Sequence, residues 1–231
     1  MTNPLKLLVY APNAAFVMPY FIREFADYEI TDSLDCEFDK AVMVSSTDVY
    51  NAATGCGHDE TTQLLQRHSL LKIEEEFCRA CERRGIPPTI LRCPAIVGTG
   101  MTGLPREMVN KIYRGTYMHI KGVEEHLSVI HASDVAKAAA CCLDSGLTLI
   151  ATDGEDPTYS NLAEALAYRL DQKRIFTISE RWARWRYNSA LYNTLTNTLT
   201  FSSLRLQQEF GFRPTPVCRY LTTHVYDDES L

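Results

Sequence analysis

The sequence predicts an α/β fold with a largely parallel sheet, and three observations lead to this prediction. Strand-like apolar runs alternate with helix-like segments along the chain, which is the pattern of βαβ units. The run from Lys40 to Ser45 is apolar almost throughout, as in a strand that is buried on both faces. No repeat or low-complexity linker interrupts the alternation, so the 231 residues are expected to form one domain with a small lobe.

Short apolar runs predict the other strands of this sheet. In chain order they are Lys6 to Tyr10, Tyr28 to Thr31, Thr89 to Cys93, Leu127 to Ile130 and Leu147 to Thr152.

Amphipathic spacing and end signals predict the helices between the strands. Gly85, Gly115 and Gly211 each follow a helical segment at the position of a C-cap. Ser133 is placed to begin another helix, with the acidic Asp134 in its first turn. The expected helices are Phe16 to Phe25, Thr62 to Arg84, Leu104 to Arg114, one from Ser133, one from about Ser160, Trp182 to Leu199 and Ser203 to Phe210.

The first strand and helix form a βα unit whose connecting turn contains no glycine. The turn reads Ala11-Pro12-Asn13-Ala14-Ala15, and Met18 follows inside the helix. In a dinucleotide-binding βα unit this turn holds the pyrophosphate on backbone amides, and glycine lets the phosphate approach without a Cβ in the way. Alanine methyl groups and a proline without an N–H therefore predict weak or absent dinucleotide binding.

The composition argues against nucleic acid as a partner. Lys and Arg number 23 against 29 Asp and Glu, which gives a formal net charge of −6. No apolar run approaches the length that crosses a bilayer, and the N-terminal stretch lacks the apolar core of a secretion signal. We therefore expect a cytoplasmic protein with no membrane partner, in which the eight scattered cysteines are reduced thiols.

No metal site is expected from the spacing of cysteine and histidine. Cys78 and Cys81 form a lone C-x-x-C inside a predicted helix, and Cys56 lies near His58 in a loop. Neither group has a second pair of ligands to complete a tetrahedral set. Core packing and a turn are the simpler interpretations.

The segment that follows the strand from Lys40 carries a recognisable pattern. Ser45 and Ser46 end the strand and a Val-Tyr pair follows, and later segments continue the pattern at Leu91 to Gly98, Val129 to Ala136 and Glu209 to Pro214. In this order they resemble the NAD(P)-dependent epimerase/dehydratase family, the extended short-chain dehydrogenases that act largely on nucleotide sugars. The resemblance implies a Rossmann-like doubly wound parallel sheet over residues 1–231, with a small lobe formed mainly by about 100–125 and 173–231. It also implies NAD or NADP as cofactor, if any is bound, and a nucleotide-sugar-like small molecule as ligand.

The first half of the chain departs from this family. Only a short stretch separates Phe25 from Ala41, where the family has two further βα steps, so the sheet is expected to be shortened on its adenine side. Asp32 falls where a Rossmann acidic residue would bind the adenosine ribose, although an acidic surface loop explains it equally well. The cofactor-binding residues that the resemblance implies are Ala11, Ala15, Asp32, Arg92, Pro94, Ala95 and Ile96.

The catalytic motif of the family is also altered. Its Tyr-x-x-x-Lys places both side chains on one helical face, where the lysine lowers the pKa of the tyrosine so that the phenolate can take a proton. In this chain His68 aligns with the tyrosine, Lys72 with the lysine, and Ser46 with the residue that hydrogen-bonds the reacting oxygen. The resemblance thus implies Ser46, His68 and Lys72 as catalytic residues, and a solvated helix face is the alternative.

Two functions are open at this point. One is a degenerate, non-catalytic relative with weakened or lost dinucleotide binding, retained for a binding or scaffold role. The other is an active NAD(P)-dependent nucleotide-sugar epimerase, dehydratase or reductase that uses Ser46, His68 and Lys72. Relatives often dimerise through the helices that correspond to Thr62 to Arg84 and Leu104 to Arg114, so the resemblance also implies a homodimer.

The segment from Arg181 to Tyr187 has two interpretations. Its aromatic and guanidinium groups could lie against a nucleotide diphosphate, or the stripe could pack a helix onto the lobe.

Overall fold

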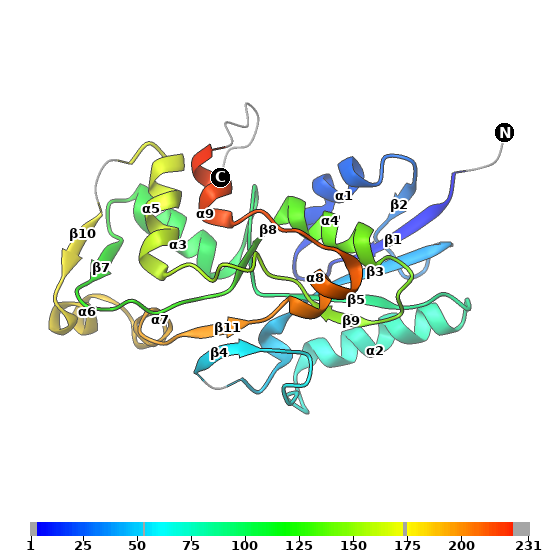
Figure 1. The fold of residues 1–231 in the computed structure, drawn as a ribbon, viewed down its shortest axis with the longest axis horizontal. Coiled ribbons are helices and arrows are strands. Elements are labelled where there is room, and N and C mark those ends of the chain that lie inside the picture. The colour runs from blue at the N-terminus through cyan, green and yellow to red at the C-terminus, as the bar shows by residue number, and fades with distance from the viewer. Residues whose placement is uncertain (1–3, 53, 173–174, 224–231) are drawn as a thin grey trace.

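A five-stranded parallel sheet forms the centre of the molecule in the computed structural model, which describes residues 4–52, 54–172 and 175–223 (Figure 1). Its strand order is β2-β1-β3-β5-β9, and every neighbouring pair is parallel. The strands are β1 (Lys6–Tyr10), β2 (Glu29–Thr31), β3 (Lys40–Ser46), β5 (Thr89–Cys93) and β9 (Thr148–Ile150). This arrangement confirms the predicted α/β, Rossmann-like fold.

The sheet ends early on the side where an adenine would lie. Strand β2 has three residues and pairs with β1 alone, and no strand of the described residues lies beyond it. The prediction of a sheet shortened on its adenine side is confirmed.

Helices cover both faces of the sheet because its strands alternate their side chains between two apolar layers. Leu7 and Val9 face α1 (Met18–Glu24) and α4 (Ala132–Cys142), where they join Phe21 in one hydrophobic cluster. Leu8 faces α2 (Ser69–Glu82) on the opposite side and packs in a cluster with Phe77. In Figure 1, α1 and α4 lie above the sheet and α2 lies below it.

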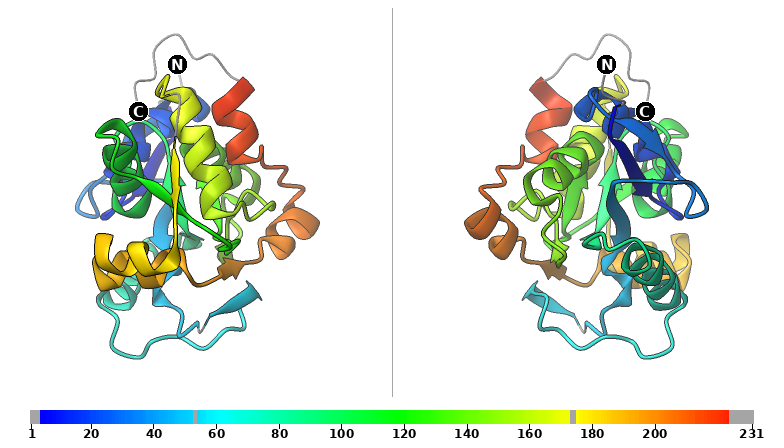
Figure 2. Two further views of the ribbon diagram at one scale, coloured as in Figure 1. Left: turned by 90° about the vertical axis from the view of Figure 1, so that its left-hand side faces the viewer. Right: turned by 90° about the vertical axis from the view of Figure 1, so that its right-hand side faces the viewer.

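A lobe built from short elements lies beside the sheet at the left of Figure 1, and it faces the viewer in the left-hand view of Figure 2. Its core is a second hydrophobic cluster that contains Met108, Leu162, Leu166 and Val217. In chain order, the remaining α-helices are α3 (Gly103–Tyr113), α5 (Tyr159–Arg169), α6 (Glu180–Arg186), α7 (Ser189–Leu195), α8 (Leu204–Phe210) and α9 (Val217–Thr223). Three two-stranded parallel pairs complete the fold: β4 (Gly55–His58) with β11 (Leu199–Phe201), β6 (Ala95–Val97) with β8 (Val129–His131), and β7 (Met118–Ile120) with β10 (Phe176–Ile178).

The expected lobe boundaries of 100–125 and 173–231 include α3, β7 and α6, although 173–174 and 224–231 lie outside the described residues. Helix α5, which precedes that second range, packs against α9 and α3 in the same cluster.

Two buried aspartates fasten the C-terminal segment to the rest of the fold. Asp134 accepts a hydrogen bond from the backbone N–H of Thr215 at 2.6 Å, and Asp153 accepts one from that of Val217 at 2.9 Å. Burial raises the pKa of Asp153 to about 6, even though its backbone hydrogen bonds favour the ionised form.

Side-chain caps move several helix boundaries away from the predicted ones. Helix α2 begins at Ser69, because His68 has an extended backbone and its ring accepts a hydrogen bond from the N–H of Leu70. Helix α4 is capped by His131 and not by Ser133. The expected helix from Trp182 to Leu199 is divided into α6 and α7, since Asn188 caps the second piece by accepting from the N–H of Leu191 at 2.8 Å.

Candidate functional site

A cleft of about 410 Å³ lies at the carboxyl ends of β1, β3 and β5. Parallel strands end at one edge of a sheet, and ligands of open α/β folds bind there. Its walls are formed by the turn after β1, the end of β3, the segment after β5, the start of α3 and β11, with single residues from other elements. The lining residues are Asn13, Ala14, Phe16, Val44 to Asp48, Leu70, Cys93 to Ile96, Thr102 to Pro105, Leu127, Ser128, Tyr159, Thr194, Leu199 and Phe201.

The two serines at the end of β3 line this cleft, but their hydroxyl groups already have partners inside the protein. The Oγ of Ser46 accepts a hydrogen bond from the N–H of Asp48 at 3.1 Å and thereby caps the 3-10 turn Thr47–Val49. The Oγ of Ser45 donates to Oε1 of Glu74 at 2.6 Å.

A buried ion pair lies behind Ser45 and joins α2 to β5. Arg92 donates from Nε to Oε1 of Glu74 at 3.0 Å and from Nη2 to Oε2 at 2.6 Å. The two side chains are 9% and 7% exposed, and the guanidinium lies 5.0 Å from the centre of the Tyr50 ring. Burial opposes the charge on Arg92, but its hydrogen bonds to Glu74 and its interaction with Tyr50 together outweigh this effect, and the pKa of Arg92 is raised above its ordinary value.

Arg92, the arginine of this ion pair, is one of the residues that the resemblance implied as cofactor-binding. The guanidinium of Arg92 points to α2, and Arg92 is not among the residues that line the cleft. The neighbouring Pro94, Ala95 and Ile96 do line it.

The glycine-free turn is packed into the core. Ala11 and Ala14 are each 8% exposed and belong to the hydrophobic cluster beneath α1 and α4. Two turn amides are hydrogen-bonded within the chain, that of Ala14 to the carbonyl of Ala11 at 3.1 Å and that of Val17 to the carbonyl of Ala14 at 2.9 Å. Of the predicted residues, Ala11 and the exposed Ala15 do not line the cleft. Asp32 is exposed and borders a separate groove between α1 and β2.

Of Ser46, His68 and Lys72, Ser46 is the residue that lines the cleft. The residue of α2 that lines the cleft is Leu70. Successive helical residues are turned by about 100°, so Lys72 lies about 200° around the axis from Leu70, and its side chain is exposed. His68 is the cap in front of the helix and borders another groove, formed with Asn51 and the segment 63–67.

The charge of the cleft is unusual for a site that would hold phosphates. None of the described residues that line it is Lys, Arg or His, and its single acidic residue is Asp48. A pyrophosphate there would meet the methyl group of Ala14, turn amides that are already hydrogen-bonded, and a nearby carboxylate. The residues present do not fit a dinucleotide bound in the ordinary way.

Sequence reasoning missed the residues that organise this edge of the sheet. Leu70, Glu74, Phe77 and Cys81 form the buried stripe of α2, at spacings that place an acid on the apolar side of an amphipathic helix. An arginine inside the apolar run of β5 was the matching signal, because a buried charge requires a partner.

Solved structures place the fold among known proteins. No family model matches the sequence, and no curated protein does. Among solved structures, the RMD of Pseudomonas aeruginosa complexed with NADPH is similar at 13% identity with a TM-score of 0.65, covering 94% of this chain and 97% of that one. The UDP-N-acetylglucosamine 4-epimerase of Bacillus cereus is similar at 13% identity with a TM-score of 0.64, covering 95% and 100%. A putative epimerase from Burkholderia cenocepacia is similar at 15% identity with a TM-score of 0.61, covering 93% and 72%.

The chain therefore shares the α/β fold of these solved structures, which include two described as epimerases and one complexed with NADPH. Helices with the length and apolar character to span a membrane are not found in 4–52, 54–172 or 175–223. Within the same ranges, no group of three or more His, Cys, Asp or Glu side chains is arranged to hold a metal ion.

Proposed function

We propose that this chain is a non-catalytic binding protein on an epimerase/dehydratase fold, in which dinucleotide binding is weakened or lost. The observation that carries the proposal is the chemistry of the cleft wall. Its described residues supply no cation, and the α2 residue that faces it is Leu70.

Helix α2 supplies no general base to this wall. A base must come within about 2.6–3.2 Å of the proton that it removes. Leu70 has no ionisable group, and Ser46 uses its Oγ to cap a turn. His68 and Lys72 lie away from the cleft.

The same wall weakens dinucleotide binding. A hydrogen bond to a charged group contributes about 1.5–3 kcal/mol. The amide of Ala14 is hydrogen-bonded to Ala11 inside the turn, so one such bond to a pyrophosphate is lost. This amounts to about 1.5–3 kcal/mol, or roughly one to two orders of magnitude in affinity.

A neutral or cationic small molecule suits the cleft better than a diphosphate. Asn13 and Thr102 offer neutral polar groups, and Asp48 offers the carboxylate. A nucleotide-sugar-like ligand would have to place its phosphates outside this wall.

Calorimetry with NAD, NADH, NADP and NADPH tests the proposal. We expect no saturable binding at micromolar concentration, and we expect Leu70→Lys to tighten dinucleotide binding by adding a cation to the wall. Lys72→Ala is the matched control, because it changes a charge on the other side of the same helix and should have no effect. Saturable micromolar binding by the parent protein would overturn the proposal.

The alternative is an active nucleotide-sugar epimerase, dehydratase or reductase that uses Ser46, His68 and Lys72. It is favoured by the presence of Ser46 in the cleft beside Pro94, Ala95 and Ile96. Turnover of a UDP-sugar that His68→Ala and Lys72→Ala both abolish, with unchanged melting temperatures, would establish it. The homodimer through α2 and α3 remains a proposal, and sedimentation of the purified protein measures it.

A further inference from the structure

Helix α6 is barely anchored by its side chains, and its aromatic residues point into solvent. Ala183 is the one buried residue between Glu180 and Arg186. Trp182 and Trp185 are 62% and 76% exposed, and their rings meet edge to face with centroids 5.7 Å apart. These are the two tryptophans of the chain. The tryptophans of this stripe therefore do not pack α6 onto the lobe.

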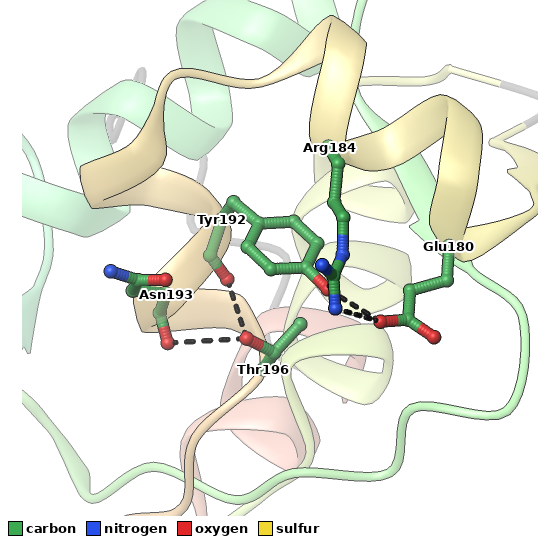
Figure 3. A network of polar contacts seen from close by, with 5 residues as sticks. All are labelled: Glu180, Arg184, Tyr192, Asn193 and Thr196. Carbon is green, nitrogen blue, oxygen red and sulfur yellow. Dashed lines mark hydrogen bonds and ion pairs between the residues drawn. The ribbon is translucent and has the colours of Figure 1, made fainter.

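The acidic residue of α6 is neutralised by a network that joins the helix to α7 (Figure 3). Oε1 of Glu180 accepts from Nη2 of Arg184 at 2.8 Å and from the hydroxyl of Tyr192 at 2.8 Å. The Nε of Arg184 also donates to that hydroxyl at 3.1 Å. In the same view, the hydroxyl of Thr196 donates to the backbone carbonyl of Tyr192 at 2.9 Å and stabilises the end of α7.

The two other arginines of α6 are not neutralised in this way. Arg181 and Arg186 are exposed, and neither forms an ion pair within the part of the chain that the structure describes. At about 100° per residue, Trp185 and Arg181 lie opposite the buried Ala183. Trp182 lies one turn from Trp185 on the same side.

Phe176 of β10, 62% exposed, lies just before α6 in the chain. Figure 1 shows β10 and α6 at the left end of the molecule, away from the central sheet. We call the surface formed by Arg181, Trp182, Trp185 and Arg186 the α6 ridge.

We infer that the α6 ridge binds an acidic segment of a partner protein that carries apolar side chains between its carboxylates. Exposed clusters of large apolar side chains mark interaction surfaces, and tryptophan and arginine are the residue types that contribute most to protein interfaces. Guanidinium groups bind carboxylates through paired hydrogen bonds. The inference deepens the binding role proposed above but uses a surface separate from the cleft.

Charge favours a short acidic segment over an extended anionic surface. The chain carries a net charge of −6, so a nucleic acid or an anionic bilayer would face repulsion from the whole molecule. Charges are screened beyond about 8 Å at physiological ionic strength. A peptide segment within that distance meets the local positive charge of Arg181 and Arg186.

The test uses a fluorescein-labelled short peptide in which Glu alternates with Leu and Phe. Binding is measured by fluorescence anisotropy with the label and by tryptophan emission with an unlabelled copy, since both tryptophans lie on the ridge. We expect a blue shift on binding and an affinity that falls with salt. The double variant Arg181→Glu, Arg186→Glu should bind at least about tenfold more weakly, equivalent to about 1.4 kcal/mol. Arg79→Glu, an exposed change on α2, should leave the affinity unchanged.

Trp182→Ala supplies an independent variant that leaves Trp185 as reporter, and it should also weaken binding while circular dichroism stays unchanged. Absence of binding or of the blue shift, or equal losses in the Arg79→Glu and double variants, would overturn the inference. Stronger binding to phosphatidylglycerol vesicles or to a DNA oligonucleotide than to the peptide would overturn it as well. Dinucleotide binding at the cleft would contradict the proposed function without changing the peptide result.

Discussion

Replacing Glu74 by glutamine tests whether the ion pair beneath Ser45 behaves as a buried one. Glutamine keeps the shape of the side chain but leaves the charge of Arg92 without a counter-charge, at a site where both side chains are less than 10% exposed. Removing one partner of a buried pair costs about 3–5 kcal/mol. For a protein of this size each kcal/mol corresponds to about 2–4 °C. Glu74→Gln should therefore lower the melting temperature by roughly 6–20 °C.

The free energy of unfolding is measured by urea denaturation at neutral pH, with circular dichroism as the signal. The dependence of this free energy on urea concentration must have the same slope in both proteins. Glu209→Gln is the matched control, because it breaks an exposed pair with Arg205 whose atoms lie 3.1 Å apart. An exposed pair contributes about 0–1 kcal/mol. If Glu74→Gln costs no more than this control, the reasoning about burial is refuted.

A double variant separates the cost of an unpaired charge from the value of the pair. Changing both Glu74 and Arg92 to Met removes both charges and keeps most of the volume. Such replacements are often neutral or stabilising by about 1–4 kcal/mol. The double variant should therefore be more stable than Glu74→Gln, and a further loss would show that the pair itself stabilises the fold.

Three further predictions follow from buried groups. Burial raises the pKa of Asp153 from its ordinary value of 3.8 to about 6. The free energy of unfolding of the parent, compared with that of Asp153→Asn, should therefore fall by up to roughly 3 kcal/mol as pH rises from about 4 to about 6. Parallel pH profiles of the two proteins in urea titrations would contradict this. A Cβ at Gly98 would lie 2.9 Å from Cβ of Ala132 and 3.1 Å from the hydroxyl of Tyr20, so Gly98→Ala should cost about 1–3 kcal/mol, and an unchanged thermal melt would argue against that contact. Thiol titration of the folded protein should quickly label the exposed cysteines, which are Cys36, Cys56 and Cys141. The buried cysteines, which are Cys81, Cys93 and Cys142, should react only after denaturant is added.

The strands of the central sheet were predictable because their signal is local. Burial on both faces of β3 and β5 leaves long apolar runs, and such runs identify interior strands of parallel sheets. A strand was predicted at Leu127 to Ile130, where β8 lies, but it pairs with β6 and not with the central sheet. Strand β4 pairs with β11, where Gly55 lies opposite Leu199, and a contact across so much sequence leaves no local pattern.

The face of α2 was the part of the site that sequence could not fix. Alignment to the Tyr-x-x-x-Lys pattern assumes that both residues lie within a helix, but His68 stands before it as a cap. Tyr50 and Leu64 form an isolated bridge, and a turn at residues 66–67 separates it from the cap. The start of α2 is therefore set by a capping imidazole that follows a turn.

This register of α2 also explains why the polar residues at the strand ends serve the fold. The α2 side that faces the sheet and cleft carries Leu70 and Glu74. Glu74 accepts from Ser45 and from Arg92, and Ser46 caps its own turn. A group whose hydrogen bonds are satisfied inside the protein must break them before it can contact a ligand, at a cost of about 1–3 kcal/mol when it is buried. Ser45 and Arg92 thus hold Glu74 of α2 on the sheet, and Ser46 stabilises a turn, which agrees with the binding role proposed above.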